Sequence, residues 1–257
     1  MILHPIPAFS DNYIWALHDG QRALVVDPGE ADGVLNWLDQ EHLTLDTILI
    51  THHHGDHTGG VGRLRTRTGA RVIGPANEPV PESAEPVNGG ASLMALGLRI
   101  DVIDVPGHTA GHVAYFLPDA GGQPVLFSGD TLFSAGCGRL FEGTPAQMLQ
   151  SLERLAAMPA HTRLCCAHEY TLSNLRFALT VDPDNPALAT HAEHCRQQRE
   201  RNLPTLPSSI GLERQINPFL RCAQPALQAA ACRHDPTTAA NTLAVFTTLR
   251  GWKNVFS

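Results

Sequence analysis

The stretch DTILITHHHGDHTGG, residues 46–60, joins a short apolar run to a cluster of histidines. The run at 46–50 is short enough to be a buried strand, so the cluster begins just past the C-terminal end of that strand. Residues 51–57 then contain four histidines and one aspartate, more ring nitrogens than a hydrophobic core could satisfy. The stretch therefore predicts a metal site at the end of a strand.

Three other metal-ligand candidates lie at the ends of other predicted strands. His108 follows the strand that ends near Val105, Asp130 ends LFSGD and His168 ends LCCAH. The candidate ligands are His52, His54, Asp56, His57, His108, Asp130 and His168. One ion takes about three or four protein ligands, so this set is too large for one tetrahedral ion. It fits two ions that share one carboxylate and lie roughly 3.5–4 Å apart. Imidazole and carboxylate ligands suit zinc, iron or manganese, and the sequence does not separate these metals.

The first two-thirds of the chain alternate between strand-like and helix-like segments. Further strands are predicted at 13–17, 23–27, 71–74, 98–106, 112–117, 124–130 and 163–168. Helices are predicted at 31–42, 61–69 and 145–158, and then at 171–179, 186–202, 225–233 and 236–252. No strand is predicted after residue 171. The pattern predicts an α/β (α+β) fold with two mixed sheets, helices outside them, and a domain boundary near residue 170.

Composition narrows the function classes. The formal net charge is −7, with an acidic body and a mildly basic C-terminal part, and this disfavours nucleic acid as a partner. The six cysteines form no C-x-x-C, which predicts reduced thiols and a cytoplasmic protein. We expect no signal peptide at the N-terminus and no membrane partner, because no apolar run is long enough to span a bilayer.

Several motifs carry a resemblance to known families. THHHGDHTGG, PGHTAGH, FSGDTLF and AHEYT are similar to conserved stretches of the metallo-β-lactamase fold. SDNYIW, AGCGRLFEGT, HEYTLSNLRFA, SSIGLER and NPFLR, which span nearly the whole chain, resemble glyoxalase II, the hydroxyacylglutathione hydrolase family. This resemblance implies a metallo-β-lactamase-like αββα sandwich with a dinuclear metal site over residues 1–170. It also implies a helical substrate-binding domain over residues 171–257.

The resemblance also implies roles for individual residues. The first metal's ligands would be His52, His54 and His108. The second metal's ligands would be Asp56, His57 and His168. Asp130 would bridge the two ions, and Asp130, Asp56 and His57 would hold a metal-bridging hydroxide. The glutathione contacts would be Arg139, Tyr170, Asn174, Arg250 and Lys253, with Phe141 standing where some members carry a tyrosine.

The implied activity is hydrolysis of S-(2-hydroxyacyl)glutathione, with S-D-lactoylglutathione as the expected substrate, in methylglyoxal detoxification. Zinc is the expected metal and a monomer the expected state. The alternative is a glutathione persulfide dioxygenase with a single iron, which would not need Asp56, His57 and His168. A β-lactamase or lactonase does not account for the helical tail. A nuclease does not fit the acidic body, and a binding module would have no use for the ligand set.

The remaining polar residues receive simpler interpretations. His53 is expected to point out of the site, and His112 to support the fold or the ligands. His191 and His194 share a helix face and are expected to be solvated. Asp27 is expected to orient a metal-binding histidine. Cys137 is interpreted as turn packing, because no general base is placed beside it.

Overall fold

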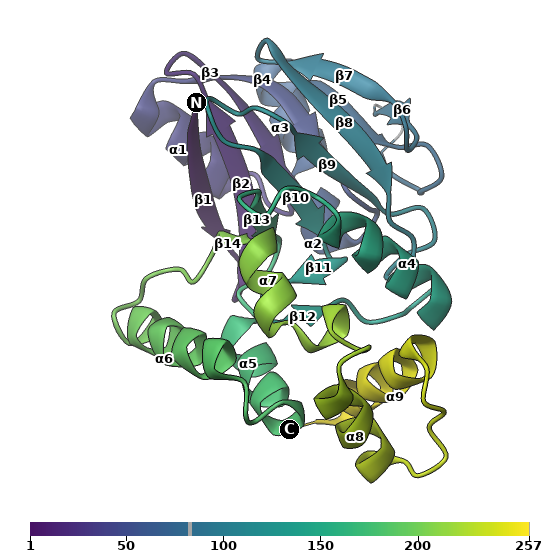
Figure 1. Ribbon diagram of the computed structural model, residues 1–257. Coiled ribbons are helices and arrows are strands. Elements are labelled where there is room, and N and C mark those ends of the chain that lie inside the picture. Colours follow the sequence, from purple (N-terminus) through teal and green to yellow (C-terminus); the bar gives the residue numbers. More distant parts are fainter. Residues whose placement is uncertain (82–83, 257) are drawn as a thin grey trace.

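The computed structural model describes residues 1–81 and 84–256 of the chain. Two six-stranded sheets pack against each other, with helices on the outer side of each (Figure 1). A further sheet of two short strands lies near the edge of this sandwich. The predicted fold class, an αββα sandwich followed by helices, is confirmed.

The first sheet has the order β1-β2-β3-β4-β5-β6. Its strands are β1 Ile2–Ala8, β2 Asn12–His18, β3 Arg22–Val26, β4 Thr44–Leu49, β5 Arg71–Pro75 and β6 Glu85–Val87. Strands β1 to β3 pair antiparallel, and β3 to β6 pair parallel. The sheet is therefore mixed, as the sequence predicted, although β1 and β6 were not foreseen.

The second sheet has the order β14-β13-β10-β9-β8-β7. Its strands are β7 Ser92–Ala95, β8 Leu98–Asp104, β9 Val113–Leu117, β10 Val125–Gly129, β13 Arg163–Cys166 and β14 Ser208–Ser209. Only β10 and β13 pair parallel. The short strands β11 Leu132–Phe133 and β12 Gly136–Cys137 form a hairpin directly after β10.

The helices are α1 Asp32–Glu41, α2 Gly55–Thr58, α3 Val61–Thr68, α4 Pro145–Ala156, α5 Thr171–Val181, α6 Pro186–Glu200, α7 Ile210–Ile216, the 3-10 turn η1 Pro218–Leu220, α8 Pro225–His234 and α9 Thr242–Val255. Helix α4 begins with a capping box, in which the Thr144 and Gln147 side chains bond each other's backbone N–H, and with Pro145 at its first turn. None of these helices, over the described part of the chain, is both long and apolar enough to cross a membrane.

The core follows the two-residue period of the strands. In β2, Trp15 and Leu17 pack between the two sheets, whereas Ile14 and Ala16 pack under α1 and α3. A third layer of buried side chains lies between the second sheet, α4 and the C-terminal helices. Each sheet is thus covered on both faces, which leaves the strand ends as the places where polar side chains can gather.

The C-terminal region is bonded into the second sheet. Strand β14 pairs antiparallel with β13, so the prediction of no strand after residue 171 was wrong. A strand of two residues has no repeating pattern that a sequence could show. Next to it, the buried Glu213 carboxylate accepts hydrogen bonds from Ser208 Oγ, from Ala135 N at 2.7 Å and from Asn217 Nδ2 at 3.1 Å. This carboxylate fastens α7 to the β11–β12 hairpin.

Candidate metal centre and substrate pocket

The candidate metal ligands gather at one end of the sandwich. His52 follows β4, His108 follows β8, Asp130 follows β10 and His168 follows β13. Because β10 and β13 are parallel neighbours, Asp130 and His168 leave the sheet side by side. Polar residues at adjacent strand ends are a common way to build a site on a rigid scaffold.

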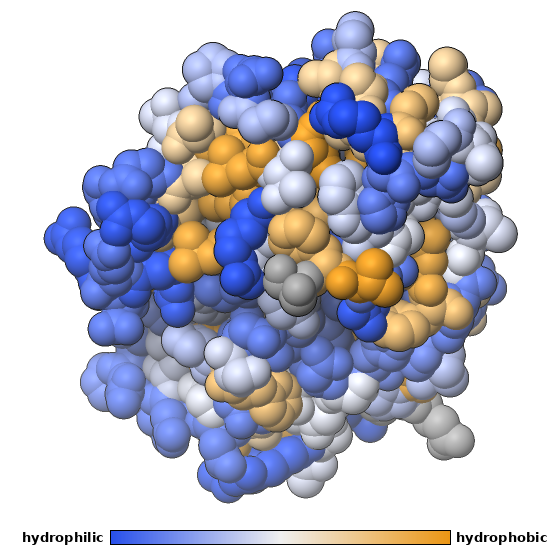
Figure 2. Space-filling model, turned by 90° about the horizontal axis from the view of Figure 1, so that it is seen from below, coloured by the Kyte–Doolittle hydropathy of each residue, from blue (hydrophilic) through white to orange (hydrophobic). Residues whose placement is uncertain are grey.

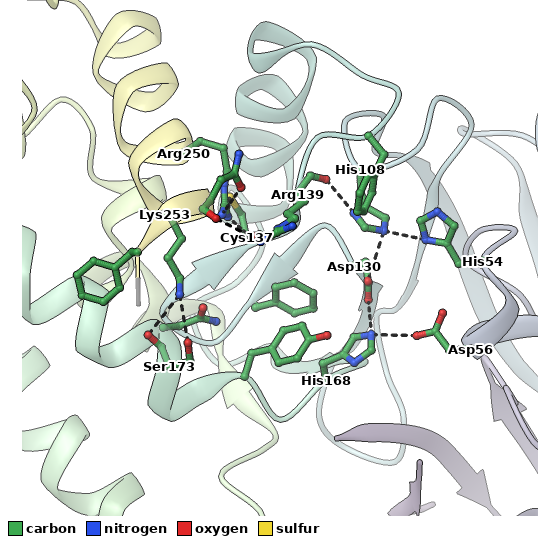
Figure 3. Close-up of a pocket in the computed structure, with 16 residues that line it drawn as sticks. His54, Asp56, His108, Asp130, Cys137, Arg139, His168, Ser173, Arg250 and Lys253 are labelled. Carbon is green, nitrogen blue, oxygen red and sulfur yellow. Dashed lines mark hydrogen bonds and ion pairs between the residues drawn. The ribbon is translucent and has the colours of Figure 1, made fainter. Parts of the chain in front are cut away.

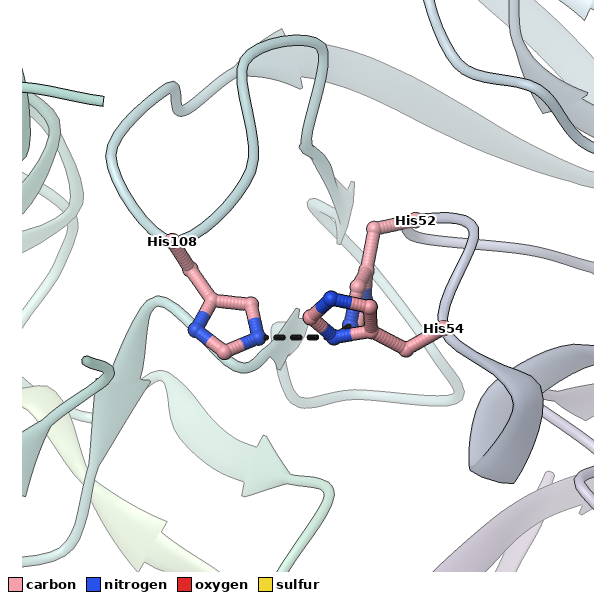
Figure 4. Close-up of side chains that lie close together, drawn as sticks. All are labelled: His52, His54 and His108. Atoms are coloured by element: carbon pink, nitrogen blue, oxygen red, sulfur yellow. Dashed lines mark hydrogen bonds between the residues drawn. The ribbon is translucent and has the colours of Figure 1, made fainter. Parts of the chain in front are cut away.

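Three histidines form the first group. The Nδ1 atom of His54 lies 3.0 Å from Nε2 of His52 and 3.1 Å from Nε2 of His108 (Figure 4). His52 and His54 come from one loop and His108 from another. A neutral imidazole has one donor nitrogen and one acceptor nitrogen, so three converging ring nitrogens cannot all satisfy one another. A cation that accepts three lone pairs fits this arrangement.

Asp56, His57 and His168 form the second group. The Oδ2 atom of Asp56 lies 3.4 Å from Nε2 of His57 and 3.5 Å from Nε2 of His168. The short helix α2 carries Asp56 and His57 and rests against the turn after β3. A Cβ atom at Gly29 would lie 1.9 Å from the carbonyl oxygen of Asp56, so this close approach requires glycine.

Asp130 lies between the two groups (Figure 3). Its Oδ1 atom is 3.5 Å from Nε2 of His57 and 3.3 Å from Nε2 of His168. Its Oδ2 atom is 3.4 Å from Nε2 of His108. One carboxylate oxygen therefore faces each group, which is the geometry that a shared carboxylate needs.

Buried atoms without partners test whether a metal pair fits here. Within residues 1–81 and 84–256, Nε2 of His57 and Oδ1 of Asp130 are buried and have no hydrogen-bond partner. Leaving a buried polar atom unsatisfied costs about 1–3 kcal/mol. Both atoms point into the space between the groups, where bound cations would satisfy them. The residues present therefore fit a dinuclear metal centre.

The pKa values differ between the two groups. Burial lowers the pKa of His52 and of His108, so both rings are neutral and can offer lone pairs at neutral pH. Burial acts in the same direction on His57, but the carboxylates of Asp130 and Asp27 outweigh it and raise the pKa of His57. A cation that binds to the second group must therefore displace a proton.

The histidine rings are oriented from behind. Nδ1 of His57 lies 3.1 Å from Oδ2 of Asp27, and the Asp27 carboxylate also accepts the Thr51 N–H at 2.7 Å. Asp27 adopts a left-handed backbone conformation, with φ of 54°, at the end of β3. The predicted placement of Asp27 behind a candidate ligand is confirmed. Such outer carboxylates fix the ring orientation of metal-binding histidines and raise their basicity.

Two supporting residues were missed by the sequence analysis. Asp11 Oδ1 lies 2.8 Å from Nδ1 of His168, and Asn12 Nδ2 donates to Oδ2 of Asp56 at 3.0 Å. Both residues lie in SDNYIW, whose first two residues belong to the turn between β1 and β2 and whose remaining residues begin β2. Neither has a spacing that links it to a partner so far along the chain.

His112 supports the centre without facing it. Its ring is fully buried, and its Nε2 atom accepts a hydrogen bond from the backbone N–H of Asp130 at 3.1 Å. The ring also stacks on His52, with centroids 4.6 Å apart. The expected supporting role of His112 is confirmed.

A cavity of about 620 Å³ opens beside the metal groups. It is lined by all six predicted substrate contacts, Arg139, Phe141, Tyr170, Asn174, Arg250 and Lys253, and also by His54, Asp56, His108, Asp130 and His168. In Figure 3 the metal-group side chains lie on one side of this cavity, and Arg250 and Lys253 lie on the other. The cavity can therefore hold a molecule whose reactive end and anionic end are separated.

The far side of the cavity carries cations fixed by α9. The guanidinium of Arg250 donates to the Cys137 carbonyl at 2.7 Å and to the Asn254 side chain at 3.0 Å. Lys253 Nζ donates to the Ser173 hydroxyl at 3.2 Å. Burial, followed by the nearby Arg250, lowers the pKa of Lys253. A ligand carboxylate would relieve this repulsion.

Two aromatic side chains that line the cavity pack against histidines of the metal groups. Tyr170 stacks on the His168 ring with centroids 4.6 Å apart, and the Phe141 ring lies 5.3 Å from His108. Burial raises the pKa of Tyr170, so its hydroxyl stays protonated and can donate a hydrogen bond. Asn174 Nδ2 donates to the Ser134 carbonyl at 3.1 Å, which fixes its amide beneath the cavity.

Other residues named in the sequence analysis lie elsewhere. All six cysteines are free, and Cys137 is buried in the β11–β12 hairpin, as turn packing predicts. His191 is not simply solvated, because its Nε2 atom lies 3.3 Å from Sγ of Cys195.

The face that the C-terminal helices present, seen from below, mixes hydrophobic and hydrophilic residues (Figure 2).

Comparison with known proteins gives two family matches that together span nearly the whole chain. The family described as metallo-beta-lactamase superfamily matches residues 9–168. The family described as hydroxyacylglutathione hydrolase C-terminus matches residues 169–256. Among solved structures, ETHE1 from Myxococcus xanthus has a TM-score of 0.66 at 24% identity and covers 98% of this chain and 100% of its own. The BLEG-1 B3 metallo-beta-lactamase has a TM-score of 0.63 at 24% identity over 85% of this chain and 99% of its own. These structures share the fold.

Curated relatives are much more similar. The hydroxyacylglutathione hydrolase of Albidiferax ferrireducens is 59% identical over 256 residues, 100% of both chains. That of Cupriavidus taiwanensis is 54% identical over 99% of this chain and 98% of its own. That of Pseudomonas aeruginosa strain PAO1 is 52% identical over 98% of each chain. With such identity over its full length, the chain belongs to the hydroxyacylglutathione hydrolase family.

Proposed function

We propose that this protein hydrolyses thioesters of glutathione, S-(2-hydroxyacyl)glutathione, to a 2-hydroxy acid and glutathione. S-D-lactoylglutathione is the substrate we expect, as part of methylglyoxal detoxification. The observation that carries the proposal is one cavity with two metal-ligand groups on one side and fixed cations on the other. The names of the close relatives support the same reaction.

We assign the two metal ions to the two groups around Asp130. His52, His54 and His108 would hold the first ion. Asp56, His57 and His168 would hold the second ion. Asp130 would bind both. Zinc is the metal we propose, and iron or manganese would also accept these ligands. When bound, such a pair lowers the pKa of water toward about 7 and polarises a carbonyl oxygen.

The protein's own residues would orient the substrate. Arg250 and Lys253 would bind a glutathione carboxylate, and Arg139 would stand nearer the metal groups on the cavity wall. Tyr170, with its protonated hydroxyl, would donate a hydrogen bond to the peptide part of the ligand. Phe141 and the stacked Tyr170 ring would limit water access around the thioester. The leaving thiol has a pKa near 8.5, so no strong general acid is needed.

Two measurements test this proposal together. We expect the reconstituted protein to bind two zinc ions per chain and to release thiol from S-D-lactoylglutathione. The single-iron alternative predicts one ion per chain and oxygen consumption with glutathione persulfide. The completeness of the second group favours hydrolysis, because an enzyme with a single iron would leave Asp56, His57 and His168 without a metal ion to bind. A chain that binds one iron and consumes oxygen would overturn the proposal.

We further propose that the protein acts in the cytoplasm as a monomer, with no nucleic-acid partner. The support for the cytoplasm is chemical, because all six cysteines are unpaired and five of them are buried. Sedimentation of the purified protein at several concentrations tests the monomer, and a dimer mass would refute it.

A further inference from the structure

One histidine of the cluster lies outside the metal groups, between two carboxylates. Nδ1 of His53 contacts Oε2 of Glu78, and its Nε2 lies 3.5 Å from Oε1 of Glu142. The backbone N–H of His53 also donates to Glu78 at 3.0 Å. His53 does point away from the site, as the sequence predicted, but it is bound there on both sides.

Glu78 joins the loops that supply the first metal group. Its side chain is 1% exposed, and its Oε1 atom accepts the N–H of Gly111 at 2.7 Å. His53 lies between His52 and His54, and Gly111 belongs to the loop of His108. One carboxylate therefore sets the spacing between the two loops that carry all three nitrogens of this group.

The backbone contact near Glu78 is close. A Cβ atom at Gly111 would lie 2.4 Å from the carbonyl oxygen of Asn77, so only glycine fits between these segments. The loop of His108 and Gly111 therefore lies directly against the segment that carries Glu78, which keeps the Glu78 carboxylate within reach of the Gly111 N–H. A small displacement of either loop would separate His54 from His108.

Glu142 joins the same region to the loop that carries two candidate substrate contacts. Its Oε2 atom accepts the N–H of Ala110 at 2.8 Å. Beside it, the Phe141 N–H donates to the His108 carbonyl at 3.2 Å. His108 Nδ1 lies 2.9 Å from the Arg139 carbonyl. The segment 139–143 is thereby fastened over the first metal group.

His53, Glu78 and Glu142 are also close enough together to surround a cation. Hydrogen bonding accounts for the geometry without one. Both oxygens of Glu78 and the Oε2 atom of Glu142 already accept backbone N–H groups. The two ring nitrogens of His53 face different carboxylates, those of Glu78 and Glu142.

We propose that His53, Glu78 and Glu142 form a carboxylate clasp that positions the active site, with separate tasks for its two acids. Glu78 positions the histidines of the first metal group, and Glu142 positions the segment 139–143 at the substrate cavity. Neither acid belongs to the two metal groups around Asp130 or lines the cavity, so both are positioning residues. This inference rests on the metal centre and cavity assigned under the proposed function.

The Glu78 task is tested by metal affinity in the Glu78→Gln variant. Glutamine keeps the shape, but its amide NH₂ would face a backbone N–H and repel it. Loss of an outer-shell partner typically lowers metal affinity by about 10–100-fold. We expect that loss at one zinc site and a change of no more than a few-fold at the other. Competition of the metal-free protein with a chromogenic chelator measures both affinities, and the cobalt spectrum reports the geometry of the weakened site.

A matched control removes a different buried carboxylate. Asp182, at the end of α5, is 5% exposed and bonds Asn185 at 2.9 Å and Arg221 at 3.1 Å. We expect Asp182→Asn to lower the unfolding temperature and to leave both zinc affinities unchanged. This comparison separates positioning from a general loss of stability. Glu78→Asp, which keeps the charge, should recover part of the lost affinity.

The Glu142 task is tested by kinetics. We expect Glu142→Ala to raise KM for the glutathione thioester about two- to tenfold, the equivalent of one hydrogen bond, with kcat and zinc content unchanged. Glu142→Gln keeps an acceptor for the Ala110 N–H and should restore most of the affinity for substrate.

Several results would overturn the clasp. Equal loss at both zinc sites, or no loss at either, in Glu78→Gln would refute the task of Glu78. A fall in kcat with unchanged KM in Glu142→Ala would refute the task of Glu142. A third zinc ion that disappears in Glu142→Ala would make the cluster a cation site. If wild type binds a single ion, the two-metal centre fails, and the clasp is still decided by whether Glu78→Gln weakens that ion.

Discussion

Replacing Lys253 with methionine removes one charge from the substrate cavity and keeps the length of the side chain. Lys253 is the only lysine in the sequence, and its Nζ atom donates to the Ser173 hydroxyl at 3.2 Å. The ammonium also lies 5.9 Å from the centroid of the Phe177 ring. Both neighbours are neutral, so removal of the ammonium leaves no charged group without a partner. We therefore expect the unfolding temperature to change little.

The expected cost appears in substrate binding. A hydrogen bond to a charged group contributes about 1.5–3 kcal/mol when shielded from water. Lys253 is only partly buried, and exposed ion pairs contribute about 0.2–1 kcal/mol. An intermediate value of about 1.4 kcal/mol corresponds to a tenfold change in an equilibrium constant. We expect Lys253→Met to raise KM for S-D-lactoylglutathione about tenfold, with kcat unchanged, because the contact is the same in ground and transition states.

Thiol release from S-D-lactoylglutathione, measured over a range of substrate and salt concentrations, provides the assay. A simple thioester without the glutathione carboxylates should show no difference between wild type and Lys253→Met. Arg176 supplies a matched control, because it lies one turn after Ser173 on the exposed side of α5. Arg176→Met should weaken substrate binding by only about 0.2–1 kcal/mol, and this effect should disappear at high salt. If kcat falls and KM does not change in Lys253→Met, Lys253 does not bind substrate and the reasoning is wrong.

Three further outcomes follow from the structure. Asp130→Ala should lose both zinc ions and nearly all hydrolysis, since one of its oxygens faces each group; retention of one ion at wild-type affinity would exclude a shared carboxylate. Burial raises the pKa of Glu213, so its carboxyl group binds a proton more tightly in the folded state. Stability should therefore fall as pH rises from the unfolded pKa through the folded pKa. Glu213→Gln, whose amide can donate to the Ser208 hydroxyl, should flatten this fall in urea unfolding, whereas an unchanged slope would contradict it. An amine-reactive reagent should modify only the α-amino group and Lys253, and glutathione should protect Lys253; mass spectrometry of the peptides checks this.

The ligands that a sequence could reveal are those that end a strand. His108, Asp130 and His168 each follow an apolar segment, so their convergence at one end of a sheet could be predicted from alternation alone. The division of ligands between two ions came from the resemblance, and the structure places them in two groups of that composition. Two mixed sheets with helices outside them could be predicted because the strands are apolar and the helices amphipathic, whereas the αββα sandwich is what the resemblance implies.

The supporting residues could not be predicted for a physical reason. Asp11 and His168 are separated by 157 positions, and only the pairing of strands brings them together. Glu78 also follows a strand, but the sequence Asn77-Glu78-Pro79 is typical of an ordinary turn and does not indicate a buried carboxylate. The bond it makes depends on the path of the loop at Gly111. Such pairs depend on the relative placement of loops, which the periodicity of single segments does not contain.

The bonds that Glu213 and Asn217 make with the β11–β12 hairpin limit how this enzyme could be re-engineered. Asn217 Nδ2 donates to the carbonyl oxygens of Phe133 at 3.1 Å and Gly136 at 3.0 Å. The same hairpin carries Cys137, whose carbonyl oxygen orients Arg250. A chimera designed to accept a different thiol could exchange α8 and α9, but it would have to keep β14 and α7 from the recipient. The segment that could be exchanged to change the thiol specificity therefore begins after Asn217. A graft that begins at α5 would also replace Glu213 and Asn217, and the β11–β12 hairpin would lose the hydrogen bonds that hold it beside the metal groups.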